Sequence, residues 1–368
     1  MTVISRRRTL GLLGATVLPM PFVRRANAEE PVVHIYNWAD YIGETTLADF
    51  TAETGIEVVY DTLSSNEEAE AKLVTGQSGY DLVLLTGSSL PRLAPAGTVQ
   101  PLDRKALPLW GNLDSEILRL GASWDPGNAH GFPYTWGTAG ITYNADLVKE
   151  RLPDADLTSL DLILKPENAA KLADCGITLL DTPEAVLGMT MAYLGLDPAA
   201  LTAQNIDAAV AVLVGVRPSI QTFDNTNFLN TLPTSEVCVA NTFAGDYATA
   251  VGRAMESGIE VNLGYFVPRT GAPIWVDNFC IPADAPHPAN AHLFLNFLLR
   301  PEVIAATTNY TYYANASLAS RTFVAPDILA NPAIYPDAEV MARLYTQPTP
   351  TDDQMRLLID AWRKIKNG

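Results

Sequence analysis

Four short segments combine the side chains that an organic cation needs. Three of them place a carboxylate a few positions from an aromatic ring, and the fourth adds two tyrosines. They are Trp38-Ala39-Asp40-Tyr41, Phe243-Ala244-Gly245-Asp246, Trp275-Val276-Asp277 and Tyr312-Tyr313-Ala314-Asn315. A carboxylate offers an ammonium group charge-assisted hydrogen bonds, and an aromatic face adds a cation–π contact of about 0.5–2 kcal/mol. The same rings pack against a methylene chain, so the pattern indicates an alkylammonium ligand.

Each segment also has a purely structural interpretation. Trp38 and Trp275 fit a hydrophobic core, and Asp40 and Asp246 could cap the N-termini of the helices that follow them. Spacing alone does not separate these interpretations, because the ligand hypothesis requires all four segments to meet in the tertiary structure.

The elements around these segments alternate between strands and helices. We predict strands at 32–36, 56–60 and 81–85, separated by helices at 44–54 and 66–75. This order predicts a parallel α/β sheet, and ligands of such sheets bind beyond the carboxyl ends of the strands. The first segment directly follows the strand at 32–36, and Phe243 to Asp246 follow a strand predicted at 237–241.

The length of 368 residues suits two lobes better than one hydrophobic core. A second α/β block is predicted with helices at 166–174, 183–194 and 205–216, and strands return at 261–268 and 275–281. Segments near 134–140 and 255–262 are predicted to cross between the lobes. We therefore expect one lobe from 29–134 plus 259–313 and another from 135–258 plus 314–368. Hinges between two lobes permit rigid-body closure on a ligand.

Residues 1–28 have the features of an export signal. Arg6, Arg7 and Arg8 precede an apolar run at 10–23, and Ala26-Asn27-Ala28 offers a cleavage site. The paired arginines resemble a twin-arginine signal, and the apolar run is short for a membrane span. We therefore predict a periplasmic protein that does not span the membrane after cleavage.

The charge of the chain excludes several classes of partner. Removing the five arginines of the signal leaves 19 basic against 41 acidic residues, a net charge of −22. Such a surface repels nucleic acid and anionic membranes.

Cysteine and histidine spacing gives no sign of a metal site. An oxidising compartment allows a disulfide between Cys175 and Cys238 that leaves Cys280 free, although spacing does not decide this pairing. No zinc pattern, nucleophile elbow or phosphate loop occurs, so we predict no metal, no cofactor and no catalysis. A carboxylate-dependent hydrolase is the enzymatic alternative.

Several motifs resemble one family over almost the whole chain after the signal. They include Tyr36-Asn37-Trp38-Ala39-Asp40-Tyr41-Ile42, Ala244-Gly245-Asp246, Leu298-Leu299-Arg300-Pro301-Glu302-Val303 and Tyr313-Ala314-Asn315-Ala316. The sequence resembles the periplasmic polyamine-binding proteins, especially the putrescine-binding branch. The resemblance implies the type II periplasmic-binding-protein fold, with two discontinuous α/β lobes and a two-segment hinge. It also implies an ABC importer whose permease receives the ligand, and we expect a monomer.

The resemblance assigns a role to individual residues. It implies a ligand site of three acids, five aromatic residues and one hydroxyl: Trp38, Asp40, Tyr41, Thr86, Phe243, Asp246, Trp275, Asp277 and Tyr313. It also implies that Cys175 and Cys238 form a disulfide.

The chain departs from the family pattern at four positions. Ala39 replaces a Ser or Thr, Ala185 replaces an acid of the putrescine branch, and Phe243 and Trp275 exchange aromatic types. Ala39, Asp181 and Glu184 are therefore additional candidates for ligand contact, the two acids because they could compensate for Ala185. A different organic cation or an opine-like solute is the alternative ligand.

Overall fold

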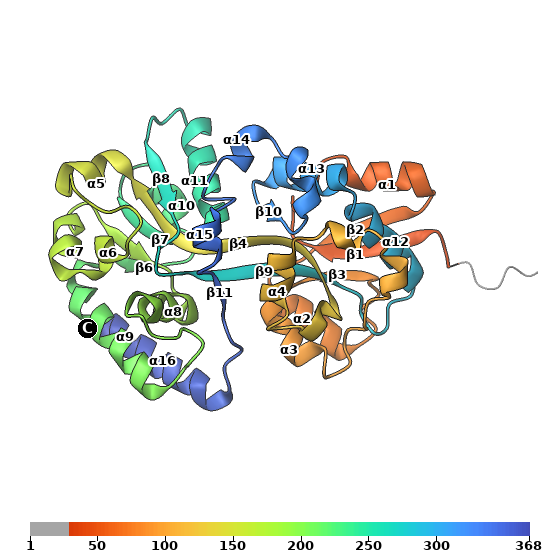
Figure 1. Ribbon diagram of the computed structural model, residues 1–368, viewed down its shortest axis with the longest axis horizontal. Coiled ribbons are helices and arrows are strands. Elements are labelled where there is room, and N and C mark those ends of the chain that lie inside the picture. The colour runs from red at the N-terminus through yellow and green to blue at the C-terminus, as the bar shows by residue number, and fades with distance from the viewer. Residues whose placement is uncertain (1–28) are drawn as a thin grey trace, which may run out of the picture.

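The computed structural model describes residues 29–368, so the predicted signal peptide lies outside the described residues. Two α/β lobes lie side by side, and strands β4 (Gly131–Asn144) and β9 (Pro273–Cys280) run between them (Figure 1). Across the described part of the chain, no helix combines the length and apolarity that a membrane crossing requires.

The first lobe contains the N-terminal strands. Their order in the sheet is β2-β1-β3-β9-β4, with β1, β2 and β3 parallel and β9 antiparallel to both β3 and β4. Its elements are β1 (Val32–Asn37), α1 (Thr46–Thr54), β2 (Glu57–Thr62), α2 (Asn66–Thr75), β3 (Leu82–Thr86), α3 (Leu90–Leu93), α4 (Ser115–Gly121), α12 (Pro288–Leu298), α13 (Pro301–Thr311), β10 (Ala314–Asn315), α14 (Pro326–Leu329) and α15 (Ala338–Met341). The prediction of a parallel α/β sheet from the alternating pattern is confirmed.

The second lobe continues the sheet in the order β4-β7-β5-β6, with β8 also pairing with β4. Its elements are α5 (Ala145–Arg151), α6 (Asp161–Leu164), α7 (Pro166–Leu172), β5 (Ile177–Leu179), α8 (Pro183–Tyr193), α9 (Ala203–Val216), β6 (Thr222–Phe223), α10 (Phe228–Thr231), β7 (Val239–Phe243), α11 (Ala244–Glu256), β8 (Leu263–Phe266) and α16 (Asp352–Asn367). Strands β5, β6 and β7 are parallel to one another, whereas β7 is antiparallel to β4.

Strand β4 belongs to both lobes because it changes partners along its length. Gly131 to Thr138 pair with β9, and Ala139 to Tyr143 pair with β7. The predicted crossing near 134–140 therefore coincides with the change of partner. A third segment, β11 (Tyr345–Thr346), pairs with β9 at Pro273 and Ile274 and leads into α16 of the second lobe.

The crossing predicted near 255–262 lies elsewhere. Strand β8 follows that segment and pairs with the Ile141–Asn144 end of β4, inside the second lobe. Pairing with β3 of the first lobe begins in β9, which starts at Pro273. The sequence placed the crossing too early because it showed where a strand begins but not which part of β4 it pairs with.

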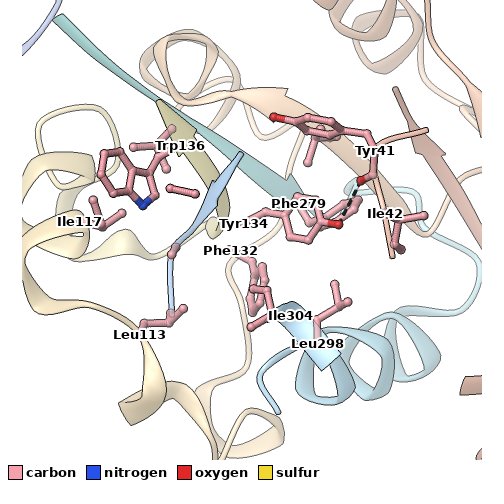
Figure 2. Close-up of a cluster of buried hydrophobic side chains, with 14 of the residues drawn as sticks. Tyr41, Ile42, Leu113, Ile117, Phe132, Tyr134, Trp136, Phe279, Leu298 and Ile304 are labelled. Atoms are coloured by element: carbon pink, nitrogen blue, oxygen red, sulfur yellow. Dashed lines mark hydrogen bonds between the residues drawn. The ribbon is translucent and has the colours of Figure 1, made fainter. Parts of the chain in front are cut away.

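Two large hydrophobic cores lie on either side of the crossing strands. The core of the first lobe includes Phe132, Tyr134, Phe279 and Ile304, which pack together in Figure 2. This core also buries side chains from 314–344, including Ile334, whereas the other core takes residues of α16. We therefore propose lobe boundaries that follow the cores, with 29–136 and 272–344 in one lobe and 139–266 and 352–368 in the other. This proposal moves 314–344 out of the lobe expected from the sequence.

Local signals explain where α2 begins and where α1 ends. The Ser65 hydroxyl accepts the Glu68 N–H at the start of α2, and Gly55 ends α1 with a φ of 73°, a conformation that favours glycine. Helix α2 has the predicted bounds, and α1 begins two residues after the predicted start at 44.

A disulfide links Cys175 and Cys238, with their Cα atoms 5.4 Å apart, and Cys280 is free and buried. The Cys238 N–H also donates to the Cys175 carbonyl at 2.9 Å, so the bond joins the edge of β5 to the start of β7. The predicted pairing is confirmed.

We expect the double variant Cys175→Ser/Cys238→Ser to lose about 4 kcal/mol of unfolding free energy, because the disulfide closes a loop of 63 residues. Urea unfolding followed by circular dichroism measures this loss. Reductant should destabilise the parent by a similar amount and leave the double variant unchanged. Equal stability of the parent and the double variant without reductant would contradict the prediction.

Candidate functional site

One cavity brings together all nine residues of the predicted ligand site. Its volume is about 820 Å³, and it lies where the two lobes meet. The lining includes Trp38, Asp40, Tyr41, Thr86, Phe243, Asp246, Trp275, Asp277 and Tyr313, together with Ala39. The four chemical segments are therefore one site in three dimensions, although they span most of the chain.

The loop after β1 is held by buried polar groups of the first lobe. The Asn37 side chain donates to the Tyr41 carbonyl at 3.2 Å and accepts the Trp38 N–H at 2.8 Å. The Tyr134 hydroxyl donates to the same Tyr41 carbonyl at 3.0 Å, as Figure 2 shows, and the Tyr60 hydroxyl donates to the Trp38 carbonyl. These bonds preorganise Trp38 and Tyr41 at the carboxyl end of β1.

Asp40 is exposed at the apex of this loop and has a φ of 53°, in the left-handed region that Asp tolerates. It does not cap α1, because that helix starts at Thr46 with Thr45 in the capping position. The structural alternative for Asp40 is therefore wrong. Its carboxylate remains available at the cavity surface.

Asp277 is the most buried of the three acids. It lies on β9 opposite Thr86 of β3 and Thr135 of β4. One carboxylate oxygen accepts the Tyr41 hydroxyl and the other accepts the Thr86 hydroxyl, both at 3.0 Å. Burial raises the pKa of Asp277 to about 6, although these two hydrogen bonds act in the opposite direction.

Asp246 supplies the acid of the second lobe from the first turn of α11. Its carboxylate accepts the Phe243 N–H at 2.9 Å and also lines the cavity. Asp246 therefore lies inside the helix and bonds back to its N-cap, Phe243, rather than taking the predicted N-cap position itself. Burial raises the pKa of Asp246 to about 6, and the Phe243 hydrogen bond only partly offsets it. Among the ion pairs within residues 29–368, none involves Asp246 or Asp277.

Three rings form a continuous aromatic wall. Tyr313 contacts the ring of Tyr41 at 5.4 Å and that of Trp275 at 5.5 Å between centroids, with both pairs edge to face. Trp275 covers Gly137, its partner across β4 and β9, where an added Cβ would lie 2.5 Å from the indole. The wall therefore rests on both of the crossing strands.

The structure does not bring Asp181 and Glu184 into the cavity lining. Asp181 instead accepts the Trp362 indole N–H at 2.6 Å and pairs with Lys366 at 2.8 Å, both on α16. Glu184 is in the first turn of α8, where Ala185 is buried. The acid missing at Ala185 is therefore not replaced by either neighbour in this arrangement.

Three further lining residues were not predicted: Tyr310, Thr311 and Gln347. Tyr310 and Thr311 end α13, just before the Tyr312-Tyr313 segment, so proximity in sequence was a usable signal. Gln347 follows β11, and nothing in its local sequence indicated that the chain passes the cavity there.

The geometry favours a cationic organic ligand. Carboxylates from both lobes face a space walled by rings, and the two most buried acids form no ion pair with any side chain of residues 29–368. Within the described chain, no group of three acidic, histidine or cysteine side chains is placed to hold a metal ion. A metal ion would bind the carboxylates but not the aromatic wall, whereas an alkylammonium binds both.

The fold and the cavity define a two-lobed solute-binding protein with a cavity lined by residues of both lobes. Residues 45–336 match the family described as bacterial extracellular solute-binding protein. The chain belongs to this family.

The chain is 42% identical to the putrescine-binding periplasmic protein PotF of Escherichia coli, over the full length of both chains. It is 39% identical to a putrescine/agmatine-binding protein of Pseudomonas aeruginosa, over 93% of each chain. The crystal structure of the spermidine/putrescine substrate-binding protein PotD of Streptococcus pneumoniae superposes with a TM-score of 0.83 at 28% identity, covering 91% of this chain and 98% of that one. These matches confirm the predicted two-lobed periplasmic-binding-protein fold.

We expect Asp277→Asn to stabilise the ligand-free protein at neutral pH. The native carboxyl keeps its proton up to about pH 6, whereas an unfolded Asp loses it near pH 4. The native state therefore binds more protons between these values, and the free energy of unfolding falls as pH rises through them.

Asparagine does not titrate, so the variant lacks this pH dependence. Its free energy of unfolding should exceed that of the parent by up to about 3 kcal/mol at pH 7.5 and by little at pH 4. Urea unfolding at both pH values measures the difference. Asp353→Asn, whose side chain is 89% exposed, is the control and should match the parent at both. A Asp277→Asn variant less stable than the parent at pH 7.5 would show that the carboxylate stabilises the free protein.

Proposed function

We propose that this protein captures a polyamine in the cavity between its lobes and delivers it to the permease of an ABC importer. The observation that carries the proposal is the convergence of three carboxylates and five aromatic residues from both lobes on one cavity. The relatives whose names include putrescine, spermidine or agmatine support the same ligand class.

Electrostatics favour a ligand with at least two positive charges. The carboxylates of Asp246 and Asp277 come from different lobes, and burial raises the pKa of each to about 6 when the cavity is empty. An ammonium at each carboxylate stabilises the charged form and replaces the lost hydration with short hydrogen bonds. The methylene chain between the ammonium groups then packs against Trp275 and Tyr313.

Ligand binding is proposed to favour closure of the cleft. Asp277 and the aromatic wall belong to the first lobe, and Asp246 and Phe243 belong to the second, so only a ligand that contacts both stabilises the closed arrangement. The closed pair of lobes offers the permease a surface that the open form lacks. No bond is made or broken, and the named relatives are binding proteins, which supports a function without catalysis.

The proposal includes the site of action. The signal features of residues 1–28 and the periplasmic relatives support an exported protein that acts outside the cytoplasmic membrane. We propose that it acts there as a monomer. The net charge of −22 after signal removal also favours a soluble carrier of cations.

Calorimetry with putrescine, cadaverine, spermidine and agmatine tests the ligand class. We expect at least one to bind, with an affinity that falls as pH drops below 6, because protonated Asp246 and Asp277 no longer attract the ammonium groups. The affinity should change little between pH 7.5 and 8.5. The absence of both heat and a thermal shift with all four compounds would refute the polyamine proposal.

Asp246→Asn and Asp277→Asn test the two buried acids separately. Each variant should reduce the binding free energy of the tightest-binding polyamine by about 2–5 kcal/mol, because a desolvated ammonium loses its charged partner. Asp353→Asn, on the exposed face of α16, is the matched control and should bind like the parent. Parent-like affinity of both cavity variants would mean that these acids serve only the fold.

A further inference from the structure

A contact between Tyr313 and Gly245 joins the two lobes at the edge of the cavity. Tyr313 directly precedes β10, which pairs with β4 at Thr135 and Trp136 and belongs to the first lobe. Gly245 lies in the first turn of α11, directly after β7 of the second lobe. The two residues are far apart in sequence and come from opposite lobes.

The approach is too close for any residue but glycine. A Cβ added at Gly245 would lie 2.0 Å from two carbon atoms of the Tyr313 ring and 2.1 Å from its hydroxyl oxygen. Real Cβ atoms essentially never come within 3.0 Å of such neighbours. Gly245 has ordinary helical geometry, so its backbone does not demand glycine, and the ring of Tyr313 is the reason for it.

Neighbours hem in the Tyr313 ring on three sides, and the cavity lies on the remaining side. Tyr41 and Trp275 flank it edge-on at 5.4 and 5.5 Å, and α11 covers it on the side of Gly245. Burial also raises the pKa of the Tyr313 phenol, since water is largely excluded. A side chain at position 245 must therefore displace either the aromatic wall or the start of α11.

Asp246 follows Gly245 and moves with it. Its carboxylate is held to the Phe243 N–H at 2.9 Å, so its position depends on the first turn of α11 as a unit. The Tyr313–Gly245 contact thereby sets the distance between the acid of the second lobe and the aromatic wall and Asp277 of the first.

We propose that Gly245 is a positioning residue that sets the separation of the two halves of the site. This inference rests on the proposed function, because the two halves act together only on a ligand that contacts both. Hydrogen bonds of about 3 Å from both lobes to one ligand tolerate little displacement. A side chain at position 245 that pushes the lobes apart therefore weakens the binding of every ligand that contacts both lobes.

Gly245→Ala tests the inference, with Gly252→Ala as the matched control. Gly252 is on the same helix, and a Cβ there meets nothing within 4 Å. Calorimetry with putrescine and spermidine should show at least about 10-fold weaker binding for Gly245→Ala, the effect of a moderate overpacking cost. Gly252→Ala should bind like the parent and melt at the same or a higher temperature, because alanine favours the helix.

The same substitution in a Tyr313→Ala background shows whether the effect of Gly245→Ala depends on a clash with the Tyr313 ring. With the ring removed, Gly245→Ala should change the dissociation constant by less than about 2-fold, which is the usual limit of additivity. An equal loss in both backgrounds would overturn the proposal, because the alanine would then act without Tyr313. Gly245→Ala with a lower melting temperature and a parent-like dissociation constant would also overturn it, since the contact would then be structural only.

Melting temperatures of the ligand-free variants give a second, independent cycle. Gly245→Ala should lower the melting temperature of the parent and should not lower that of Tyr313→Ala. If neither the parent nor Gly252→Ala binds any polyamine, the proposed function fails. The melting temperatures alone then decide whether the Tyr313–Gly245 contact requires glycine at position 245. Equal decreases in both backgrounds would then overturn it.

Discussion

Two largely desolvated carboxylates with no cationic side chain of residues 29–368 paired to them dominate the physics of this protein. Water is a better solvent for a charged carboxylate than a protein interior, and that is why the pKa values of Asp246 and Asp277 rise to about 6. The hydroxyl groups of Tyr41 and Thr86 reduce the cost for Asp277 but supply no positive charge. The free protein therefore carries an electrostatic cost in its cleft that a cationic ligand removes, and this cost is itself part of the ligand preference.

The sheet topology explains how the acids reach the same cavity. Strands β4 and β9 run antiparallel across the boundary between the lobes, and Asp277, Trp275 and Thr135 lie on this pair. Asp246 follows β7, which pairs with the other half of β4. One strand thus connects both halves of the site (Figure 1).

Close packing complements this electrostatic arrangement. Glycines at 137 and 245 allow Trp275 and Tyr313 to lie directly against backbone, which gives the wall a fixed position without side chains behind it. Fixed rings contribute more to binding than mobile ones, because no ordering entropy is lost when the ligand arrives. The same rigidity makes the separation of the lobes sensitive to a single added methyl group.

Much of the local structure followed from the sequence. The alternation of short apolar runs and helical segments around 32–86 identified the first strands and α2, and the pattern of acids and aromatic residues identified the chemistry of the cavity. The resemblance to a known family added Thr86 and the Cys175–Cys238 disulfide, neither of which spacing could establish.

Tertiary structure alone decided three matters. Strand pairing placed 255–262 inside the second lobe, since hydrophobic periodicity shows that a segment is a strand but not which partner it chooses. Asp181 binds Trp362 and Lys366 of α16, which lie about 180 residues further along the chain, and so it does not line the cavity. The passage of Gln347 beside the cavity likewise depends on how β11 pairs. A sequence records the type and order of its side chains, whereas the distance between remote side chains arises only from how the whole chain packs.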